Sequence, residues 1–378
     1  MKQALLLLLM ALALLSMACN TQPNRVVIGV VINKTQHPAI QLAVNEINAG
    51  GGIDGVPLEL AGMDWGTIGP VDTRSILTMG KRFDETKNLV AVIGHSDSTS
   101  TLSAAAFYNQ HKIPQIVTIA TNPSITNIGN WTYRLCLSDA AQGPALAEYA
   151  VKDLQKKRIA VFYVNDEYGR GLARLFEKRV EELGGVIVSS VMHRNVLEPD
   201  DENLITSVLS EMTGKGSPDL FALFQRTGAS GWTIRAIRKT GSQADILGGD
   251  TLGATDFVAS PPEATEGIRM SQFFLPQANG ERAMKFVRDY LEFAHQTPDY
   301  GHAFAYDAVY LIRDAVRYGG FSREGVKSYL DRIIREQIET TGVAGPYTLN
   351  ADHDARRSLA IVEIHNGKQQ FVKALSIN

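Results

Sequence analysis

Hydroxyl side chains that could bind a charged small molecule occur in two short stretches of the sequence. Residues 96–101 (SDSTST) follow an apolar segment that ends at Gly94, and residues 120–123 (ATNP) follow a second apolar segment. Hydroxyls at the start of a helix can cap its free N–H groups. With those N–H groups and the helix dipole they can instead bind an anion such as a carboxylate. The spacing alone leaves both interpretations open.

Two acids stand where they could bind a cation. Asp139 lies in residues 137–144 (LSDAAQGP), before an expected helix, and Asp250 lies in residues 248–253 (GGDTLG), after an expected strand. An acid in a cleft can bind an ammonium group through a charge-assisted hydrogen bond. Asp139 is equally suited to be a helix N-cap, so its role stays open at this point.

Tyr168 and Arg226 also follow expected strands. The ring of Tyr168 could lie over a ligand or simply cover a turn. Arg226 adds a cation to the same edge, where it could pair with a ligand carboxylate or with Asp250.

Alternating strands and helices would position these residues. Helical periodicity separates runs of apolar, largely β-branched residues, which is typical of an α/β fold with parallel sheets and right-handed crossovers. Parallel sheets bind ligands beyond the carboxyl ends of their strands, so the polar stretches are expected to face one crevice. Strands are predicted at 25–32, 56–61, 89–94, 115–119, 158–164, 186–191, 220–224 and 246–248. Helices are predicted at 38–48, 74–83, 104–111, 143–155, 169–183, 203–212 and 231–240. A C-terminal hairpin, 358–365 and 370–375, is predicted to turn at Asn366-Gly367.

Composition and missing motifs exclude several classes of protein. Lys and Arg total 37 against 40 Asp and Glu, a net charge of −3, which argues against a nucleic-acid partner. The sequence has two cysteines, too few for a disulfide scaffold or a multi-cysteine metal site. Of these, Cys136 lies between leucines and is predicted to be buried. Residues 50–55 (GGGIDG) follow a helix rather than a strand, and the sequence contains no P-loop and no GxSxG. We therefore expect no catalysis, cofactor or metal.

The N-terminus predicts export. Residues 4–15 are an apolar run whose ~18 Å helical length is too short for a ~30 Å bilayer core, as in a signal peptide. Ala18 before Cys19 resembles a bacterial lipobox, although Ser16 stands where Leu is usual. The prediction is a signal peptide over 1–18 with Cys19 lipidated, which gives a membrane-anchored protein in the periplasm or on the cell surface. The alternative is a secreted soluble protein cleaved nearby.

Several stretches together resemble the bacterial Leu/Ile/Val-binding protein family, with its type I periplasmic-binding fold. The resemblance runs over nearly the whole mature chain. It is carried by residues 45–55 (NEINAGGGIDG), 92–95 (VIGH) with the hydroxyl cluster, 120–123, 139–144, 168–173 (YGRGLA) and 342–367. It implies two Rossmann-like lobes joined by three strand crossings: lobe one at 25–140 plus 272–340, and lobe two at 141–271 plus 341–378.

The resemblance also implies roles for single residues. Ser98, Thr121 and the backbone of Ile119 would hold a ligand carboxylate, and Asp139 and Asp250 would hold its ammonium. Tyr168 would cover the ligand from lobe two. The chain departs from the family in three places. The segment 33–38 is shorter than the usual first loop, Arg226 replaces a Tyr, and Asp97 replaces a Cys found in some members.

The function expected from this resemblance is capture of an amino acid or similar small zwitterion and its delivery to the permease subunits of an ABC importer. The lobes would close on the ligand. The alternative is a sensing or interaction lipoprotein of the same fold that acts on a protein partner. A hydrolase on an α/β scaffold is disfavoured by the missing nucleophile elbow.

Overall fold

The computed structural model describes residues 22–63, 73–194, 199–214, 216–254, 257 and 265–377. The side chains of 199–204 and 213–214 are not among those described. Residues 1–21, which contain the predicted signal peptide and Cys19, lie outside this range. None of the described helices is long and apolar enough to span a membrane.

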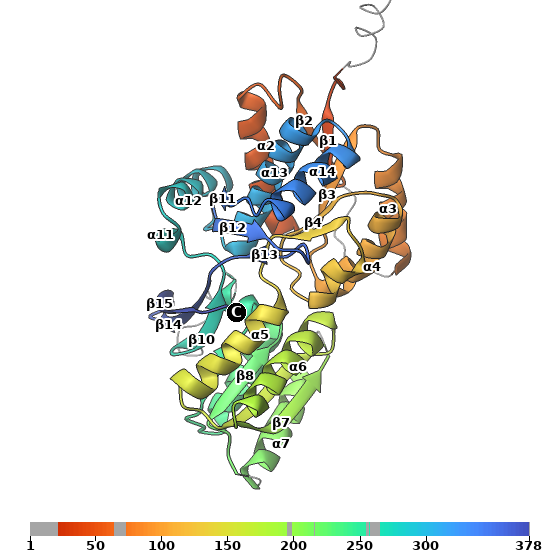
Figure 1. The fold of residues 1–378 in the computed structure, drawn as a ribbon. Coiled ribbons are helices and arrows are strands. Elements are labelled where there is room, and N and C mark those ends of the chain that lie inside the picture. Colours follow the sequence, from red (N-terminus) through yellow and green to blue (C-terminus); the bar gives the residue numbers. More distant parts are fainter. Residues whose placement is uncertain are drawn as a thin grey trace, which may run out of the picture.

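Two sheets, each covered by helices on both faces, form two lobes arranged end to end (Figure 1). The alternating strands and helices predicted from the sequence are therefore confirmed. The sheet of lobe one has five parallel strands in the order β2 (Leu58–Ala61), β1 (Val26–Val31), β3 (Leu89–Gly94), β4 (Gln115–Val117) and β5 (Thr132–Arg134). Its helices are η1 (Lys34–Gln36), α2 (His37–Ala49), α3 (Thr73–Glu85), α4 (Ser98–Gln110), η2 (Pro123–Ile128), α11 (Pro276–Asn279), α12 (Glu281–Ala294), α13 (Tyr300–Gly319) and α14 (Arg323–Arg335).

The sheet of lobe two adds the predicted C-terminal hairpin to five parallel strands. Its order is β15 (Lys368–Leu375), β14 (Leu359–His365), β10 (Arg269–Gln272), β9 (Asp245–Gly248), β8 (Leu220–Phe224), β6 (Arg158–Val164) and β7 (Val186–His193). Its helices are α5 (Asp139–Glu148), the π-helical η3 (Tyr149–Asp153), α6 (Glu167–Glu182), α7 (Pro199–Gly214), α8 (Thr227–Lys239) and η4 (Asp250–Gly253).

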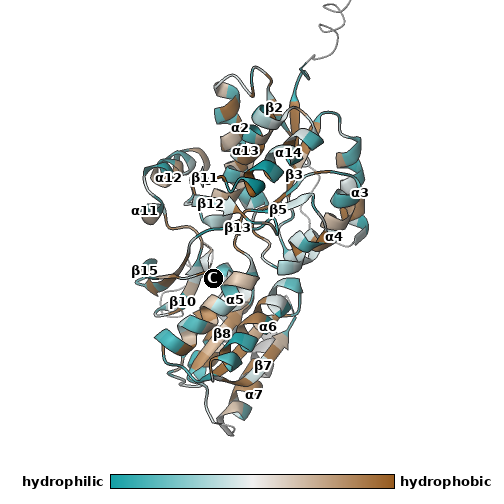
Figure 2. Ribbon diagram, in the orientation of Figure 1, coloured by the Kyte–Doolittle hydropathy of each residue, from teal (hydrophilic) through white to brown (hydrophobic). Residues whose placement is uncertain are grey.

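The strands are apolar on both sides because each side packs against helices. In β1, Val26, Ile28 and Val30 pack in the cluster that contains α2 and α13, whereas Val27 and Val31 pack in the cluster that contains α3 and α4. Figure 2 shows the same pattern in both lobes, with hydrophobic strands between mixed helices. Such doubly buried strands read as continuous apolar runs, which is why the sequence predicts them well.

Within the described residues the chain passes between the sheets three times, at 135–138, 273–275 and 357–358. A small third sheet precedes the last crossing: β11 (Thr340–Gly342), β12 (Gly345–Leu349) and β13 (Ala355–Arg356). Tyr347 and Leu349 of this sheet belong to the hydrophobic cluster of α2 and α13. The exact lobe boundaries remain a prediction, and this packing favours a last boundary near 357 rather than 341.

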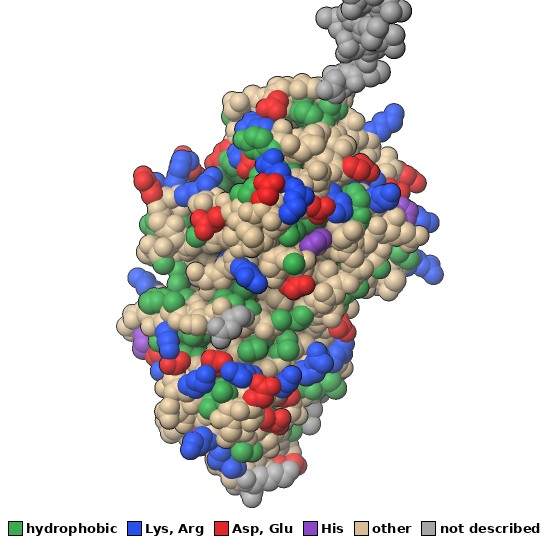
Figure 3. Space-filling view, in the orientation of Figure 1, with side chains coloured by type: hydrophobic (Ala, Val, Ile, Leu, Met, Phe, Trp, Pro, Cys, Tyr) green, Lys and Arg blue, Asp and Glu red, His purple; other side chains and the backbone are tan. Residues whose placement is uncertain are grey.

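The face of the molecule in Figure 3 carries acidic and basic side chains intermixed over both lobes. Ion pairs account for part of this mixing, for example Arg179 with Glu148 and Arg269 with Glu363. Mixed charge of this kind gives solubility without a single-sign field.

Candidate functional site

Loops at the carboxyl ends of strands from both sheets meet between the lobes. In lobe one, Ser98 follows β3, and Ile119 and Thr121 follow β4. In lobe two, Arg226 follows β8 and Asp250 follows β9. This is the position at which open parallel sheets bind ligands, as the sequence predicted.

Two carboxylates lie buried side by side at this junction. Gln142, on α5 one turn after Asp139, bridges them: its Nε2 donates to Asp139 Oδ1 over 2.9 Å and to Asp250 Oδ1 over 3.0 Å. Its Oε1 accepts from the backbone N–H of Asp250 over 3.2 Å and from the Ser271 hydroxyl over 2.6 Å. Gln142 was not predicted as a site residue, although its position three residues after Asp139 places both on one helix face.

The acid pair has no ion-pair partner among the described residues, although the charge of Arg134 lowers the pKa of Asp139 and that of Arg226 lowers the pKa of Asp250. Asp139 is fully buried and Asp250 is 2% exposed, and neither forms an ion pair with any residue that the structure describes. Burial, followed by the charge of Asp250, raises the pKa of Asp139 to about 7. Burial likewise raises the pKa of Asp250. A cation placed beside this pair would replace the missing counter-charge.

The hydroxyls of two tyrosines also donate hydrogen bonds to Asp250. Tyr168 donates to Oδ1 over 3.1 Å, and Tyr300 to Oδ2 over 3.5 Å. Burial holds the pKa of both tyrosines well above the usual value, so the hydroxyls remain neutral donors. Tyr168 lies in the first turn of α6, whose N-cap is Asp166. Tyr300 is the first residue of α13, in the segment 254–340 for which the sequence analysis predicted no element.

The predicted carboxylate-binding residues lie close to the acids. The Thr121 hydroxyl donates to Asp139 Oδ2 over 2.9 Å, and the Ser98 hydroxyl accepts from the backbone N–H of Asn122 over 3.4 Å. Both side chains are buried, whereas Ile119 is half-buried. Thr121 therefore connects the acid pair to the hydroxyl stretches.

The structure assigns the two capping roles that the sequence left open to other residues. Asp97 caps α4, since its Oδ1 accepts from the Ser100 N–H over 2.9 Å, so the hydroxyl cluster begins the helix instead of capping it. Ser138 caps α5 and leaves Asp139 as the first helical residue. The Asp139 side chain is thus available for the acid pair because its neighbour performs the capping.

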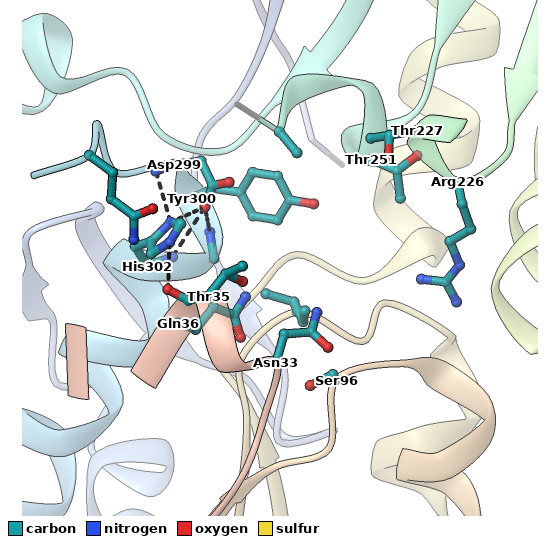
Figure 4. A pocket seen from close by; sticks show the side chains of 14 residues that line it. Asn33, Thr35, Gln36, Ser96, Arg226, Thr227, Thr251, Asp299, Tyr300 and His302 are labelled. Atoms are coloured by element: carbon teal, nitrogen blue, oxygen red, sulfur yellow. Dashed lines mark hydrogen bonds and ion pairs between the residues drawn. The ribbon is translucent and has the colours of Figure 1, made fainter. Parts of the chain in front are cut away.

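A cavity of about 430 Å³ lies between the lobes beside this group (Figure 4). Ile119 and Arg226 line it, whereas the other predicted site residues lie behind its wall. Lobe one contributes Asn33, Thr35, Gln36, Ser96, Gln296, Asp299, Gly301 and His302 together with Ile119 and Tyr300, and lobe two contributes Thr227, Thr251 and Ala254 together with Arg226. Signals for some of these residues existed: Ser96 and Thr251 stand in stretches noted from the sequence, and 33–38 was noted as a departure from the family.

A capping box shapes one wall. Asp299 caps α13, and His302 Nδ1 lies 2.6 Å from Asp299 Oδ1. The other ring nitrogen of His302, Nε2, lies 3.0 Å from the carbonyl oxygen of Thr35, which joins α13 to the loop after β1. A Cβ on Gly301 would come within 2.3 Å of Gln36 Nε2, so a residue without a side chain lets Gln36 lie against the helix.

Arg226 stands at the opposite wall as the N-cap of α8, with no side-chain cap bond. Its Nη2 lies 2.9 Å from Asp166 Oδ2, and its guanidinium lies 5.5 Å from the centre of the Tyr168 ring. Of the two pairings that the sequence left open for Arg226, the one with Asp250 is not formed, because Arg226 pairs with Asp166 and Tyr168 lies between Arg226 and Asp250.

Polar contacts also join the lobes at the rim of the cleft. The Asn122 carboxamide donates to the backbone oxygen of Glu167 over 2.6 Å, and the N–H of Glu167 donates to the Thr99 hydroxyl over 3.4 Å. Asn122 and Thr99 belong to lobe one and Glu167 to lobe two. The arrangement thus has an acid pair at the hinge, a polar cavity and a rim contact.

Comparison with known proteins identifies this architecture. A family model described as periplasmic binding protein matches residues 32–369. An amino acid binding protein of Pseudomonas aeruginosa is 29% identical over 57% of this chain, and the match spans 58% of that protein's length. A Leu/Ile/Val-binding protein homologue of Brucella suis is 28% identical over 79% of this chain and 76% of that protein.

The fold agrees with this result. The crystal structure of a leucine binding protein from Thermotoga maritima superposes with a TM-score of 0.81 at 25% identity, covering 93% of this chain and 98% of that one. Periplasmic binding proteins of ABC importers act outside the cytoplasm. The chain belongs to the periplasmic binding protein family, among the relatives of the Leu/Ile/Val-binding proteins.

Proposed function

We propose that this protein captures an amino acid or similar small zwitterion between its lobes and delivers it to the permease subunits of an ABC importer. The observation that carries the proposal is the buried, uncompensated acid pair of Asp139 and Asp250 beside a polar cavity. An ammonium group at this pair supplies the counter-charge that the described residues lack.

In this proposal the two ends of the zwitterion bind different groups. Asp139 and Asp250 accept from the ammonium, while the hydroxyls of Ser98 and Thr121 and the backbone N–H of Ile119 donate to the carboxylate. Thr121, whose hydroxyl donates to Asp139, turns this hydroxyl to the ligand on binding. On the lobe-two side, Tyr168 covers the ligand and Arg226 lines the pocket for its side chain.

We also propose that the protein is non-catalytic, works outside the cytoplasm and is anchored as a lipoprotein through Cys19 after cleavage of residues 1–18. The motif Ala18-Cys19 after an apolar run supports the anchor. Mass spectrometry of the protein purified from membranes tests it, since an acylated N-terminal Cys19 is expected. An uncleaved chain, or one cleaved elsewhere without lipid, would contradict it.

Thermal unfolding tests ligand capture directly. A chain that begins at residue 20 would be unfolded and refolded to remove carried-over ligand and then heated with each of the twenty amino acids. At a hundred times its dissociation constant a ligand stabilises by ~2.7 kcal/mol, a shift of several degrees. If no amino acid shifts the midpoint, the ligand is of another class or the protein is the interaction lipoprotein considered above.

The variant Asp139→Ala tests the assignment of the ammonium. Loss of a charge-assisted hydrogen bond of roughly 1.5–3 kcal/mol weakens binding about tenfold or more. The control is Asp352→Ala, an exposed acid in the turn before β13, which should leave the affinity unchanged. Affinity within twofold of the original in Asp139→Ala would remove Asp139 from the site.

A further inference from the structure

Polar side chains dominate the walls of the cavity. Of its described lining residues only Ile119 and Ala254 present aliphatic side chains and Gly301 has no side chain, whereas eleven present amide, hydroxyl, charged or imidazole groups. An aliphatic ligand side chain would leave the buried amide oxygen of Gln36 without a hydrogen-bond partner, at a cost of about 1–3 kcal/mol. The ligand therefore needs a polar side chain.

The charged groups on the walls are already paired. Among these charged groups, Arg226 is bound to Asp166, and the Asp299 carboxylate accepts from the backbone N–H groups of Gly301 and His302 in the first turn of α13. A second carboxylate on the ligand would meet no unpaired cation among the described lining residues, and it would lie near the carboxylates of Asp166 and Asp299. A second ammonium would face the guanidinium of Arg226. Neither charge is complemented.

The side chain of Gln36 supplies a second, independent observation that favours a polar side chain on the ligand. Its side chain is 5% exposed, and its Oε1 is buried without a hydrogen-bond partner within the described part of the chain. Rotation about the last side-chain bond exchanges the oxygen and the NH₂ group, so this amide can present either a donor or an acceptor to the cavity. Figure 4 shows Gln36 and the carboxamide of Asn33 on the lobe-one side and Arg226 on the lobe-two side.

The two walls therefore differ in their chemistry. Lobe two offers donor N–H groups on the guanidinium of Arg226, of which one nitrogen, Nη2, also bonds to Asp166. Lobe one offers carboxamides, which both donate and accept. A group that matches both walls must accept from lobe two and exchange donor and acceptor roles with lobe one, as a carboxamide does.

We propose that the ligand is an α-amino acid with a carboxamide side chain, of the glutamine or asparagine type, and that Asn33, Gln36 and Arg226 select it. This inference rests on the proposed function, since the ammonium end is placed at Asp139 and Asp250. The side-chain amide then lies between the walls of the two lobes and makes hydrogen bonds to both, so the same contacts select the ligand and hold the lobes together.

Calorimetric titration of the stripped protein at pH 8 with matched ligands tests the proposal. L-Glutamine or L-asparagine should bind at least tenfold more tightly than L-glutamate, L-aspartate, L-leucine and L-lysine, since one lost polar contact is worth about that factor. Equal or tighter binding of any of these four overturns the carboxamide proposal but leaves amino-acid capture intact. Binding of none of the amino acids overturns both.

Variants of Gln36 and Asn33 test whether the lobe-one wall of the cavity selects the ligand side chain. Gln36→Met keeps the length of the side chain and removes the amide, and it should weaken L-glutamine binding about tenfold without changing the affinity for L-alanine, whose methyl group does not reach the wall. Gln41→Met is the matched control, because Gln41 lies on α2 outside the cavity and bonds to Asn45. Gln36→Met binding L-glutamine within twofold of the original contradicts the assignment. Asn33→Leu, at an exposed position, tests the same wall if Gln36→Met does not fold.

Discussion

At the scale of single residues, the acid pair determines how the site responds to protons. Asp139 accepts hydrogen bonds from Thr121 and Gln142, yet these do not offset its burial and the neighbouring charge of Asp250. The site therefore holds a carboxyl group that gains a proton near neutral pH. A bound ammonium reverses this preference, because it stabilises the ionised carboxylate.

We therefore predict that ligand affinity depends on pH. With the pKa of Asp139 at about 7 in the free protein, an ammonium ligand must displace a proton below that pH. Affinity should then be about tenfold lower at pH 6 than at pH 8. Titration calorimetry at pH 6 in buffers of different ionisation enthalpy should show release of a proton. An affinity that is flat between pH 6 and pH 8 would contradict the prediction.

The raised pKa of Asp139 also predicts how the unfolding free energy of the protein without ligand depends on pH. Because the pKa of Asp139 is higher in the folded than in the unfolded chain, its contribution to stability is fully present below pH 4 and is lost as the pH rises through about 7. Asp139→Asn removes this contribution. The difference in unfolding free energy between the original protein and Asp139→Asn should therefore fall as the pH is raised from 5 to 8. A constant difference would show that Asp139 keeps its ordinary pKa in the fold.

At the scale of elements, the sequence predicted strands more accurately than helix starts. The runs at 89–94, 158–164 and 220–224 match β3, β6 and β8 residue for residue, because doubly buried strands have continuous apolar sequences. Helix α4 instead begins at Ser98, not 104, and α5 at Asp139, not 143. Their first turns carry polar residues that face the cleft, so the apolar periodicity starts a turn late.

Part of the candidate site could also be predicted from the sequence, because many of its residues directly follow predicted strands. Ser98, Thr121, Asp139, Tyr168, Arg226 and Asp250 all follow strands, and the rule for parallel sheets brings such residues together. Tyr300 and His302 belong to a helix that reaches the cleft from lobe one, 160 or more residues after Asp139 along the chain. Gln36 lies in a short loop without a distinctive pattern. Nothing local to these residues indicates the cavity.

Asp307, on α13, illustrates how one element positions another. Its fully buried carboxylate accepts from the backbone N–H groups of Val343, over 2.7 Å, and Ala344, over 3.1 Å, in the turn between β11 and β12. Asp307→Ala should destabilise the protein by about 2–5 kcal/mol, since two buried donors lose their partner. Denaturant unfolding followed by fluorescence measures this, with Asp352→Ala as an exposed control. Equal midpoints for the two variants would show that the turn does not need Asp307.

At the scale of the whole molecule, ligand capture requires the lobes to favour a closed arrangement. The described rim contact is small: Asn122 and Thr99 of lobe one with the backbone of Glu167 in lobe two. Since a ligand shifts an equilibrium only by its differential affinity for the two states, a small rim contact leaves most of the stabilisation of the closed state to the ligand.

Asn122→Asp tests this balance. It keeps the side-chain oxygen that accepts from the Ser124 N–H but removes the donor to Glu167, so the closed arrangement loses about 1–2 kcal/mol and ligand affinity falls about tenfold. Asn127→Asp adds the same charge on η2, where the amide bonds only within lobe one, to the Pro123 oxygen. Affinity should stay within twofold in this control. Equal losses in both variants would indicate a charge effect unrelated to closure.

Cys136 lies fully buried at the first crossing between the lobes. Its thiol donates to the backbone oxygen of Ala120 over 3.5 Å, and burial raises the pKa of this thiol. A chain that begins at residue 20 carries no other cysteine. Maleimide dyes react with thiolates, so such a chain gives almost no labelling background. Thr99→Cys places one reactive thiol at the exposed rim. A dye attached there reports the movement of lobe two, which makes the protein a ready scaffold for an optical sensor of its own ligand.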